Sequence, residues 1–165
     1  MKAHLIFNHR FNLQFAEMLL EAVPEERICQ QPGTLKNHAA WILGHIAKSC
    51  DFAATQFDVA STFPPEWNDL FQRGSQPLSD RDLYPTKAAL LTELRRQHEK
   101  LDALVEKMDD KVLARPLADE VRRQLFPTEG DFLVFVMVVH EAMHLGQLSA
   151  WRRALGLDGV IKDPS

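Results

Sequence analysis

Apolar residues recur at spacings of three and four in four stretches of the chain, which is the pattern of amphipathic helices. The first stretch, residues 3–22, ends before Pro24, which cannot continue a helix. The second follows Thr34, whose hydroxyl group suits a helix N-cap, and continues to about residue 58. Both stretches therefore predict long helices with one apolar face.

Two further helices are predicted in the second half of the chain. The third covers about residues 86–108, follows Pro85 and carries its charges opposite a leucine-rich stripe. The fourth begins after Thr128, where Asp131 stands in the position of a capping-box acid. It continues to about residue 155, and Gly156 then suits a C-terminal cap.

One segment of the fourth helix is ambiguous by periodicity. Residues 132–139 are continuously apolar and rich in Val and Phe, which also fits a buried strand. The segment continues into residues 140–145 without a turn signal, and no other stretch offers a strand to pair with it. A helix is therefore favoured, and the chain is predicted to be all-α.

The stretches between these helices, residues 59–84 and 110–127, lack periodicity and are rich in turn residues. The first is long for a structureless loop, so we expect a crossover packed by its own apolar residues. Such a connection can span the length of a helical bundle. At 165 residues the chain is predicted to form one domain, 1–165, folded as a four-helix bundle with this crossover between helices two and three.

Charge and composition exclude several classes of protein. The formal net charge is −4 and no run of Lys or Arg occurs, which argues against a nucleic-acid partner. Cys29 and Cys50 form no CxxC motif and no disulfide framework, so both are expected to be reduced. The N-terminus lacks the features of a signal peptide, and no stretch reaches the roughly 18 apolar residues of a membrane span. The protein is predicted to be cytoplasmic, without a membrane partner.

The main chemical signal is a pair of histidines on the predicted fourth helix. His140 and His144 are four residues apart, so they project from one face and can bind the same metal ion. Two polar residues on a surface helix would give the same spacing. The pair directly follows the most apolar segment of the chain, however, which indicates a central helix and an imidazole pair that needs a partner.

The same residues spell H-E-x-x-H, the motif of zinc metalloproteases, with Glu141 in the place of the general base. This interpretation is not favoured, because position 147 is Gln where the extended motif has Gly, and no Glu or His follows residue 144. A third ligand must then come from upstream. His45 interrupts the apolar run of the second helix, where a lone histidine is more often a satisfied core residue, and it is the best candidate.

Two segments resemble the DinB/YfiT-like superfamily of helical proteins: NHAAWILGHIA from Asn37 to Ala47, and HEAMHLGQL from His140 to Leu148. The resemblance covers essentially the whole chain in length and helix order. It implies a four-helix bundle with up-down-down-up connectivity, commonly a homodimer. It also implies that the metal ligands are His45, His140 and His144, and that they bind a divalent ion, most often zinc or nickel.

The resemblance also implies a function, because characterised members include thiol S-transferases that use low-molecular-weight thiols. We therefore expect a metal-dependent thiol S-transferase with a small-molecule substrate. Three neutral histidines leave an open coordination position, as in catalytic sites. Two alternatives remain: a non-catalytic metal-binding bundle acting as a stress or interaction protein, and a metal-dependent hydrolase that uses metal-bound hydroxide. The spacing alone does not choose between thiolate and hydroxide, and three imidazoles also suit copper or iron.

Two neighbours of the histidine pair are candidate catalytic residues. Gln147 follows His140 by seven residues, so it returns to nearly the same face and could bond a ligand or substrate. Glu141 lies about 100° from His140 and could orient an imidazole, pair with a neighbouring helix or act as general base. His38 is either a further group near the metal or a surface residue at the helix cap. The remaining histidines, His4, His9 and His98, are predicted to be surface residues.

Metal binding requires neutral imidazoles, which predicts a dependence on pH. The ordinary imidazole pKa is about 6.5, so protons would displace the ion between about pH 8 and pH 5. Near pH 5 the apparent affinity would fall with a slope approaching three protons per ion.

Overall fold

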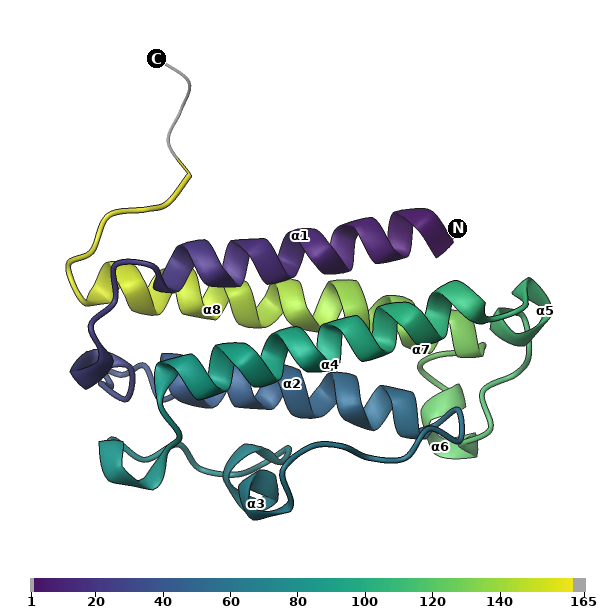
Figure 1. Ribbon diagram of the computed structural model, residues 1–165, viewed down its shortest axis with the longest axis horizontal. Coiled ribbons are helices and arrows are strands. Elements are labelled where there is room, and N and C mark those ends of the chain that lie inside the picture. The colour runs from purple at the N-terminus through teal and green to yellow at the C-terminus, as the bar shows by residue number, and fades with distance from the viewer. Residues whose placement is uncertain (1, 162–165) are drawn as a thin grey trace.

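Four long helical segments lie side by side in the computed structural model, which describes residues 2–161 (Figure 1). The first three are α1 (Lys2–Leu20), α2 (Ala39–Thr55) and α4 (Lys87–Lys107). The fourth is continuous and consists of α7 (Glu129–Val134), η4 (Phe135–His140) and α8 (Glu141–Ala154). No strand occurs among the described residues, which confirms the all-α prediction. The predicted domain 1–165 also includes Met1 and residues 162–165, which lie outside them.

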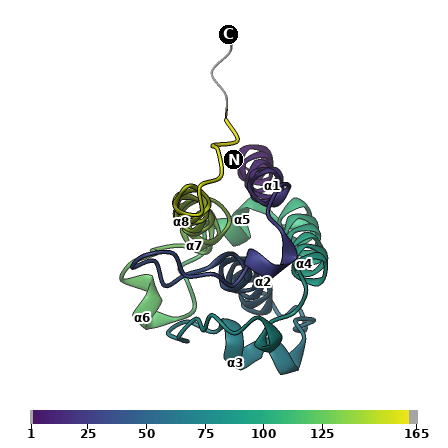
Figure 2. The same ribbon diagram turned by 90° about the vertical axis from the view of Figure 1, so that its left-hand side faces the viewer.

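The four segments surround a common core. Seen along their axes, α1 and α4 lie beside each other, as do α2 and α8 (Figure 2). α1 and the segment α7 to α8 run in one direction, and α2 and α4 run in the other (Figure 1). Short helices occupy the connections: η1 (Glu25–Arg27), η2 (Pro65–Trp67), α3 (Asn68–Phe71), η3 (Arg81–Leu83), α5 (Asp110–Leu113) and α6 (Glu120–Arg123).

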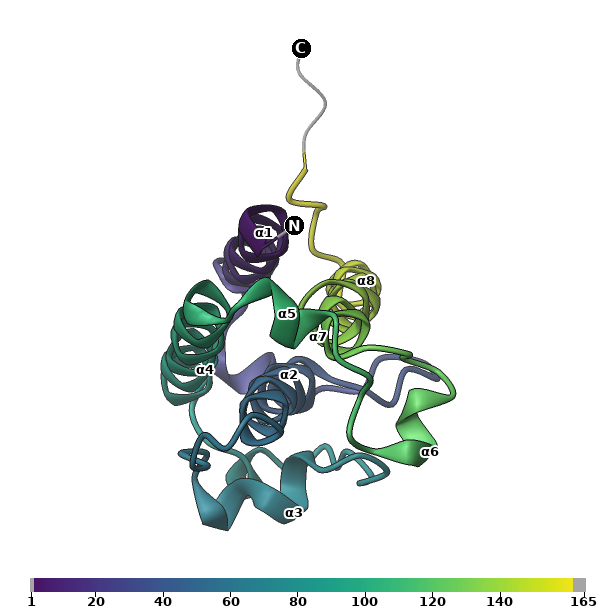
Figure 3. The ribbon, with the colours of Figure 1, turned by 90° about the vertical axis from the view of Figure 1, so that its right-hand side faces the viewer.

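The long connection between α2 and α4 packs through its own aromatic residues. α3 lies against α2 on the side away from α1 (Figure 3). The rings of Phe63, Trp67 and Phe71 contact one another edge to face, with centroids 6.0 to 6.4 Å apart. Phe71 is fully buried. This connection is therefore an ordered part of the core, and it brings the Phe71 backbone next to α2.

The predicted start of α2 was wrong by about four residues. The helix begins at Ala39, and its N-cap is His38, whose ring nitrogen accepts a hydrogen bond from the backbone N–H of Trp41. Thr34 lies in a turn before it. The side-chain amide of Asn37 donates to Gln147 of α8, so the residue before His38 makes a tertiary contact where a further helical turn was predicted.

Three other helix ends agree with the sequence signals, whereas α1 and α2 end at Leu20 and Thr55, a few residues before the predicted ends at residues 22 and 58. α4 is capped by Thr86, which accepts from the backbone N–H of Ala89. Thr128 and Asp131 form the expected capping box at the start of α7. Gly156 has φ of +76°, the left-handed conformation that ends a helix readily only at glycine.

The ambiguous segment 132–139 is helical, but part of it is a π-helix. Residues Phe135–His140 form this π segment, η4, between two α-helical parts. π segments inside α-helices are rare and occur frequently at functional sites. The side-chain amide of Asn12, buried on α1, donates to the backbone carbonyl of Met137 and so binds the segment to its neighbour. His140, the first histidine of the pair, is the last residue of this π segment.

The continuous helix Glu129–Ala154 is 26 residues long and reaches a hydropathy of 1.4. By length and composition alone it is apolar enough to cross a membrane, contrary to the expectation that no stretch would be. One such helix is weak evidence, because core helices of soluble proteins pass the same test, and this one packs against α1 and α2. A cytoplasmic location stays a prediction.

The core between the long segments is interrupted by buried polar side chains. Leu19, Ile42, Leu94 and Leu148 are fully buried and come from α1, α2, α4 and α8. Among them lie His9, Asn12, His38, His45, Asp51, Glu93, Gln97, His98, Asp102, Glu141 and His144, all with at most 8% of their surface exposed. Buried polar groups need hydrogen-bond or ion-pair partners, so these residues are expected to form specific polar interactions within the core.

Candidate metal centre

His45 of α2 faces His140 and His144 of the fourth helical segment. One ring nitrogen from each of the three lies within 4.8 Å of the others. The Nε2 atoms of His140 and His144 are 3.1 Å apart. The ring centroid of His45 lies 5.2 Å from the ring centroid of His140 and 4.9 Å from that of His144. The upstream histidine inferred from the sequence thus lies opposite the pair, and the three imidazoles converge on one place.

The ring of His45 is held from two sides. Its Nδ1 atom is 2.8 Å from the carbonyl oxygen of Phe71, so the Nδ1–H donates there and the lone pair of Nε2 faces the pair. The ring also stacks on Trp41, with centroids 4.5 Å apart and planes 9° apart. The connection that contains α3 therefore fixes both the tautomer and the orientation of this imidazole.

Gln147 orients His144. Its Oε1 atom is 3.2 Å from Nδ1 of His144 and accepts a second hydrogen bond from the side-chain amide of Asn37, at 3.0 Å. A proton on Nδ1 leaves the lone pair of Nε2 directed at the other histidines. Gln147 thus acts through His144 as a positioning residue, and Asn37 connects it to the residues before α2.

His140 has an unsatisfied ring nitrogen. Its Nδ1 atom is buried and has no hydrogen-bond partner among residues 2–161. Its Nε2 atom faces Nε2 of His144, so donor atoms of the two rings are directed at one place. Three imidazole nitrogens are a common ligand set for zinc, nickel and related divalent ions, so the residues present fit such an ion.

Burial keeps the three imidazoles neutral. It is the largest cause that lowers the pKa of His140 and of His144, each to about 4, and the neighbouring imidazoles lower both values further. Burial also lowers the pKa of His45, although its bond to the Phe71 carbonyl opposes the shift. Burial therefore shifts proton competition for these imidazoles to lower pH than the ordinary imidazole pKa would give.

The carboxylate of Glu141 does not face the three histidines. It lies in the core, with Oε1 3.3 Å from Sγ of Cys50, 3.2 Å from Nε2 of His9 and 3.0 Å from Nε2 of His98. Burial raises its pKa, but the imidazoles of His98 and His9 outweigh burial and lower the value to about 2. Of the roles open to Glu141, pairing with neighbouring helices is the one that these contacts display.

The predicted surface positions of His9 and His98 were wrong. Both are buried, with 0% and 2% of their surface exposed. Each has a carboxylate partner on another helix, which the periodicity of a single stretch does not reveal. A signal was present, because His9 lies four residues after the buried Leu5, and His98 lies four residues after the buried Leu94. His4 is exposed, as expected.

His38 is not a surface residue either, because it is fully buried. Its Nδ1 atom caps α2, and its Nε2 atom is 2.9 Å from the carbonyl oxygen of Leu78. Both ring nitrogens are therefore engaged away from the three histidines, and His38 supports the start of the helix that carries His45.

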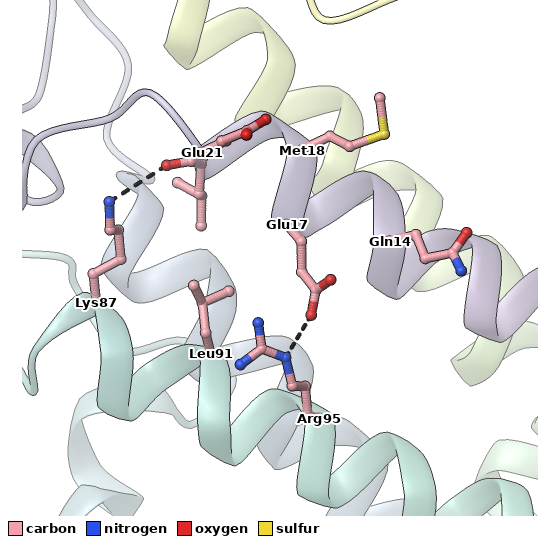
Figure 4. Close-up of a pocket in the computed structure, with 8 residues that line it drawn as sticks. Gln14, Glu17, Met18, Glu21, Lys87, Leu91 and Arg95 are labelled. Carbon is pink, nitrogen blue, oxygen red and sulfur yellow. Dashed lines mark hydrogen bonds and ion pairs between the residues drawn. The ribbon is translucent and has the colours of Figure 1, made fainter.

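A surface groove of about 550 Å³ lies between α1 and α4, apart from the three histidines (Figure 4). Glu17 and Arg95 form an ion pair across it, at 2.6 Å. Lys87 donates to the backbone carbonyl of Val23, also at 2.6 Å. None of the residues that line the groove is a predicted site residue, so it is separate from the candidate metal centre.

The fold and the site together define an all-α protein with a histidine-rich candidate metal centre. The sequence model of the DinB superfamily matches residues 11–148, and the chain belongs to this superfamily. The match includes His45, His140 and His144 as well as Gln147. Comparisons with curated proteins and with solved structures gave no match.

Proposed function

We propose that this protein is a metal-dependent thiol S-transferase built on a four-helix bundle of the DinB type. In this proposal His45, His140 and His144 hold one divalent ion, zinc or nickel. The observation that carries the proposal is the convergence of three buried or half-buried imidazoles, two of which are oriented through Nδ1 by the Phe71 carbonyl and the Gln147 amide.

The ligand set favours a catalytic site over a structural one. Three protein ligands leave at least one coordination position for a small molecule, whereas structural zinc sites use four. A divalent ion held there would lower the pKa of a bound thiol and favour the thiolate, the nucleophilic form. The choice of a thiol over water rests on the resemblance to characterised superfamily members.

The side chains around the ligands support this chemistry. Trp41 stacks on His45, and the ring of Phe135 lies 5.8 Å from that of His140, so aromatic groups flank the imidazoles and limit contact with water. In the overall reaction the thiol sulfur forms a bond to an electrophilic carbon. The leaving group departs with the electrons of its bond, and the thiol proton passes to solvent.

A conjugation assay tests the proposal. The protein loaded with zinc or nickel is incubated with a panel of low-molecular-weight thiols and a chloro-dinitrobenzene, and conjugate formation is measured. We expect turnover with at least one thiol, lost in His140→Ala and retained in the matched control His4→Ala, which changes an exposed histidine. Tight metal binding without turnover on any thiol would indicate the non-catalytic binding protein. Ester cleavage without conjugation would indicate a hydrolase.

A further inference from the structure

A second group of potential ligands lies in the core. His9 of α1, Cys50 of α2, His98 of α4 and Glu141 of α8 form this group, which we call the core cluster. Each of the four long helical segments thus contributes one residue. One donor atom from each lies within 4.8 Å of all the others, and no member exposes more than 2% of its surface.

We propose that the core cluster is a second metal site, closed to solvent and structural, for a zinc-like divalent ion. Two imidazoles, a thiolate and a carboxylate are among the ligands that zinc accepts, and structural zinc sites take four protein ligands in a tetrahedron. The proposal is independent of the proposed function, because it shares no ligand with the three-histidine site.

The separations between the donor atoms fit a tetrahedron. Four ligands about 2.0 to 2.3 Å from one ion lie about 3.3 to 3.8 Å from each other. In the core cluster, Oε1 of Glu141 is 3.2 Å from Nε2 of His9, 3.0 Å from Nε2 of His98 and 3.3 Å from Sγ of Cys50. Sγ of Cys50 is 3.6 Å from Nε2 of His9. Two of these four separations lie within the tetrahedral range, and the other two are slightly shorter.

The charges of the ligands match a divalent ion. A thiolate at Cys50 and the carboxylate of Glu141 carry two negative charges, and the two imidazoles bind metal in their neutral form. The loaded site would therefore have no net charge, which matters because an unbalanced charge is costly in a buried position. Zinc or cobalt is thus a better match for this site than a monovalent cation.

His9 has the surroundings of a metal-binding histidine. Its Nδ1 atom is 2.6 Å from Oδ1 of Asp102, and Nε of Arg10 donates to the other oxygen of Asp102 at 2.8 Å. This contact engages Nδ1, so Nε2 is the ring atom that faces the core cluster, and its proton, directed at Glu141 3.2 Å away, must leave before Nε2 binds an ion. A carboxylate behind the imidazole is the usual way in which proteins orient a histidine ligand and raise its basicity.

One rearrangement is required. The rings of His9 and His98 are stacked, with centroids 3.8 Å apart and planes 8° apart. Because each lone pair lies in the plane of its ring, one ring must rotate before both can bind one ion. His9 is fixed by Asp102, whereas Nδ1 of His98 is buried without a hydrogen-bond partner among the described residues. His98 is therefore the ring that turns.

Cobalt titration of the full-length, metal-free protein tests the second site. Co²⁺ replaces zinc and gives a thiolate-to-metal charge-transfer band in the ultraviolet only when a cysteine is a ligand. We expect the wild-type protein to bind about two ions per chain, one per site, and to show this band. The double variant His140→Ala/His144→Ala should bind one ion fewer and retain the band.

Two cysteine variants complete the experiment. Cys50→Ser should lose the band and one bound ion, whereas Cys29→Ser, which changes the other buried cysteine, should retain both. If the wild-type protein saturated with cobalt shows no band, the second site is refuted. This outcome is measured on the wild-type protein, so it does not depend on whether a variant of the core cluster folds. A band that survives in folded Cys50→Ser overturns it as well. A wild-type protein that binds only one ion per chain and still shows the band would instead contradict the proposed function, because only the core cluster would then hold metal.

Discussion

Gly44 allows α2 to approach the connection that positions His45. A Cβ atom at this position would lie 2.5 Å from Cζ of Phe71 and as close to two further carbons of that ring. Phe71 is fully buried and packed against Phe63, Trp67 and Tyr84, so the ring has little room to move. The substitution Gly44→Ala therefore tests whether this packing and the metal centre are coupled.

The magnitude follows from two opposing effects. Alanine favours the helix over glycine by about 1 kcal/mol. Overpacking a close-fitting core costs about 1 to 3 kcal/mol. Gly44→Ala should therefore lower the free energy of unfolding by up to about 2 kcal/mol. The displaced ring would also move the Phe71 carbonyl that holds His45, and lost support of this kind weakens metal binding about 10- to 100-fold.

A matched substitution isolates the packing effect. Gly146 lies inside α8, and a Cβ atom there would meet nothing within 4 Å, so Gly146→Ala should raise the free energy of unfolding by up to about 1 kcal/mol. Urea denaturation of the metal-free proteins gives the stabilities, and competition with a chelator gives the zinc affinities. Equal stabilisation by both alanines would refute the packing argument. A destabilised Gly44→Ala with unchanged zinc affinity would refute the coupling to His45.

Four further outcomes are expected. His140→Ala should lose most of the metal of the three-histidine site while the helical circular dichroism persists, because apolar burial supplies most of the folding energy; unfolding of this variant would contradict that view. Gln147→Ala should weaken zinc binding about 10- to 100-fold in chelator competition, since His144 loses its Nδ1 acceptor, and an unchanged affinity would exclude a positioning role. Burial lowers the pKa of His38 to about 4, so the unfolded chain binds more protons than the folded one between pH 4 and its ordinary value. Stability should thus fall on acidification through this range by up to about 3 kcal/mol, and His38→Asn, which can still cap the helix, should remove that share of the pH dependence. The homodimer implied by the family stays a prediction, and sedimentation equilibrium should give twice the chain mass of 18.8 kDa.

The long helices could be predicted because their signal is local. Apolar residues at spacings of three and four form one face within a single segment, whatever the rest of the chain does. The start of α2 depends on distant contacts instead. Both Thr34 and His38 can cap a helix, and His38 is used where its other ring nitrogen meets the carbonyl of Leu78 and its neighbour Asn37 meets Gln147. These contacts have no counterpart in the local sequence.

The candidate site likewise combines features that the local sequence predicts with features that depend on distant contacts. The pairing of His140 and His144 follows from one helical turn, and His45 followed from the need for a third ligand. The group that orients His45 could not be predicted, because it is the backbone carbonyl of Phe71, and a carbonyl looks the same at every position of a sequence. It reaches His45 only because the aromatic residues of the connection fold against α2.

The string H-E-x-x-H here belongs to two different sets of contacts. Successive residues of an α-helix point about 100° apart, so His140 and Glu141 face different neighbours. His140 meets His45 of α2, and Glu141 meets His9, His98 and Cys50 in the core. A metalloprotease needs the glutamate at the metal-bound water, and this carboxylate is engaged elsewhere. The motif by itself therefore does not specify its chemistry, which depends on the helices that pack against each side of α8.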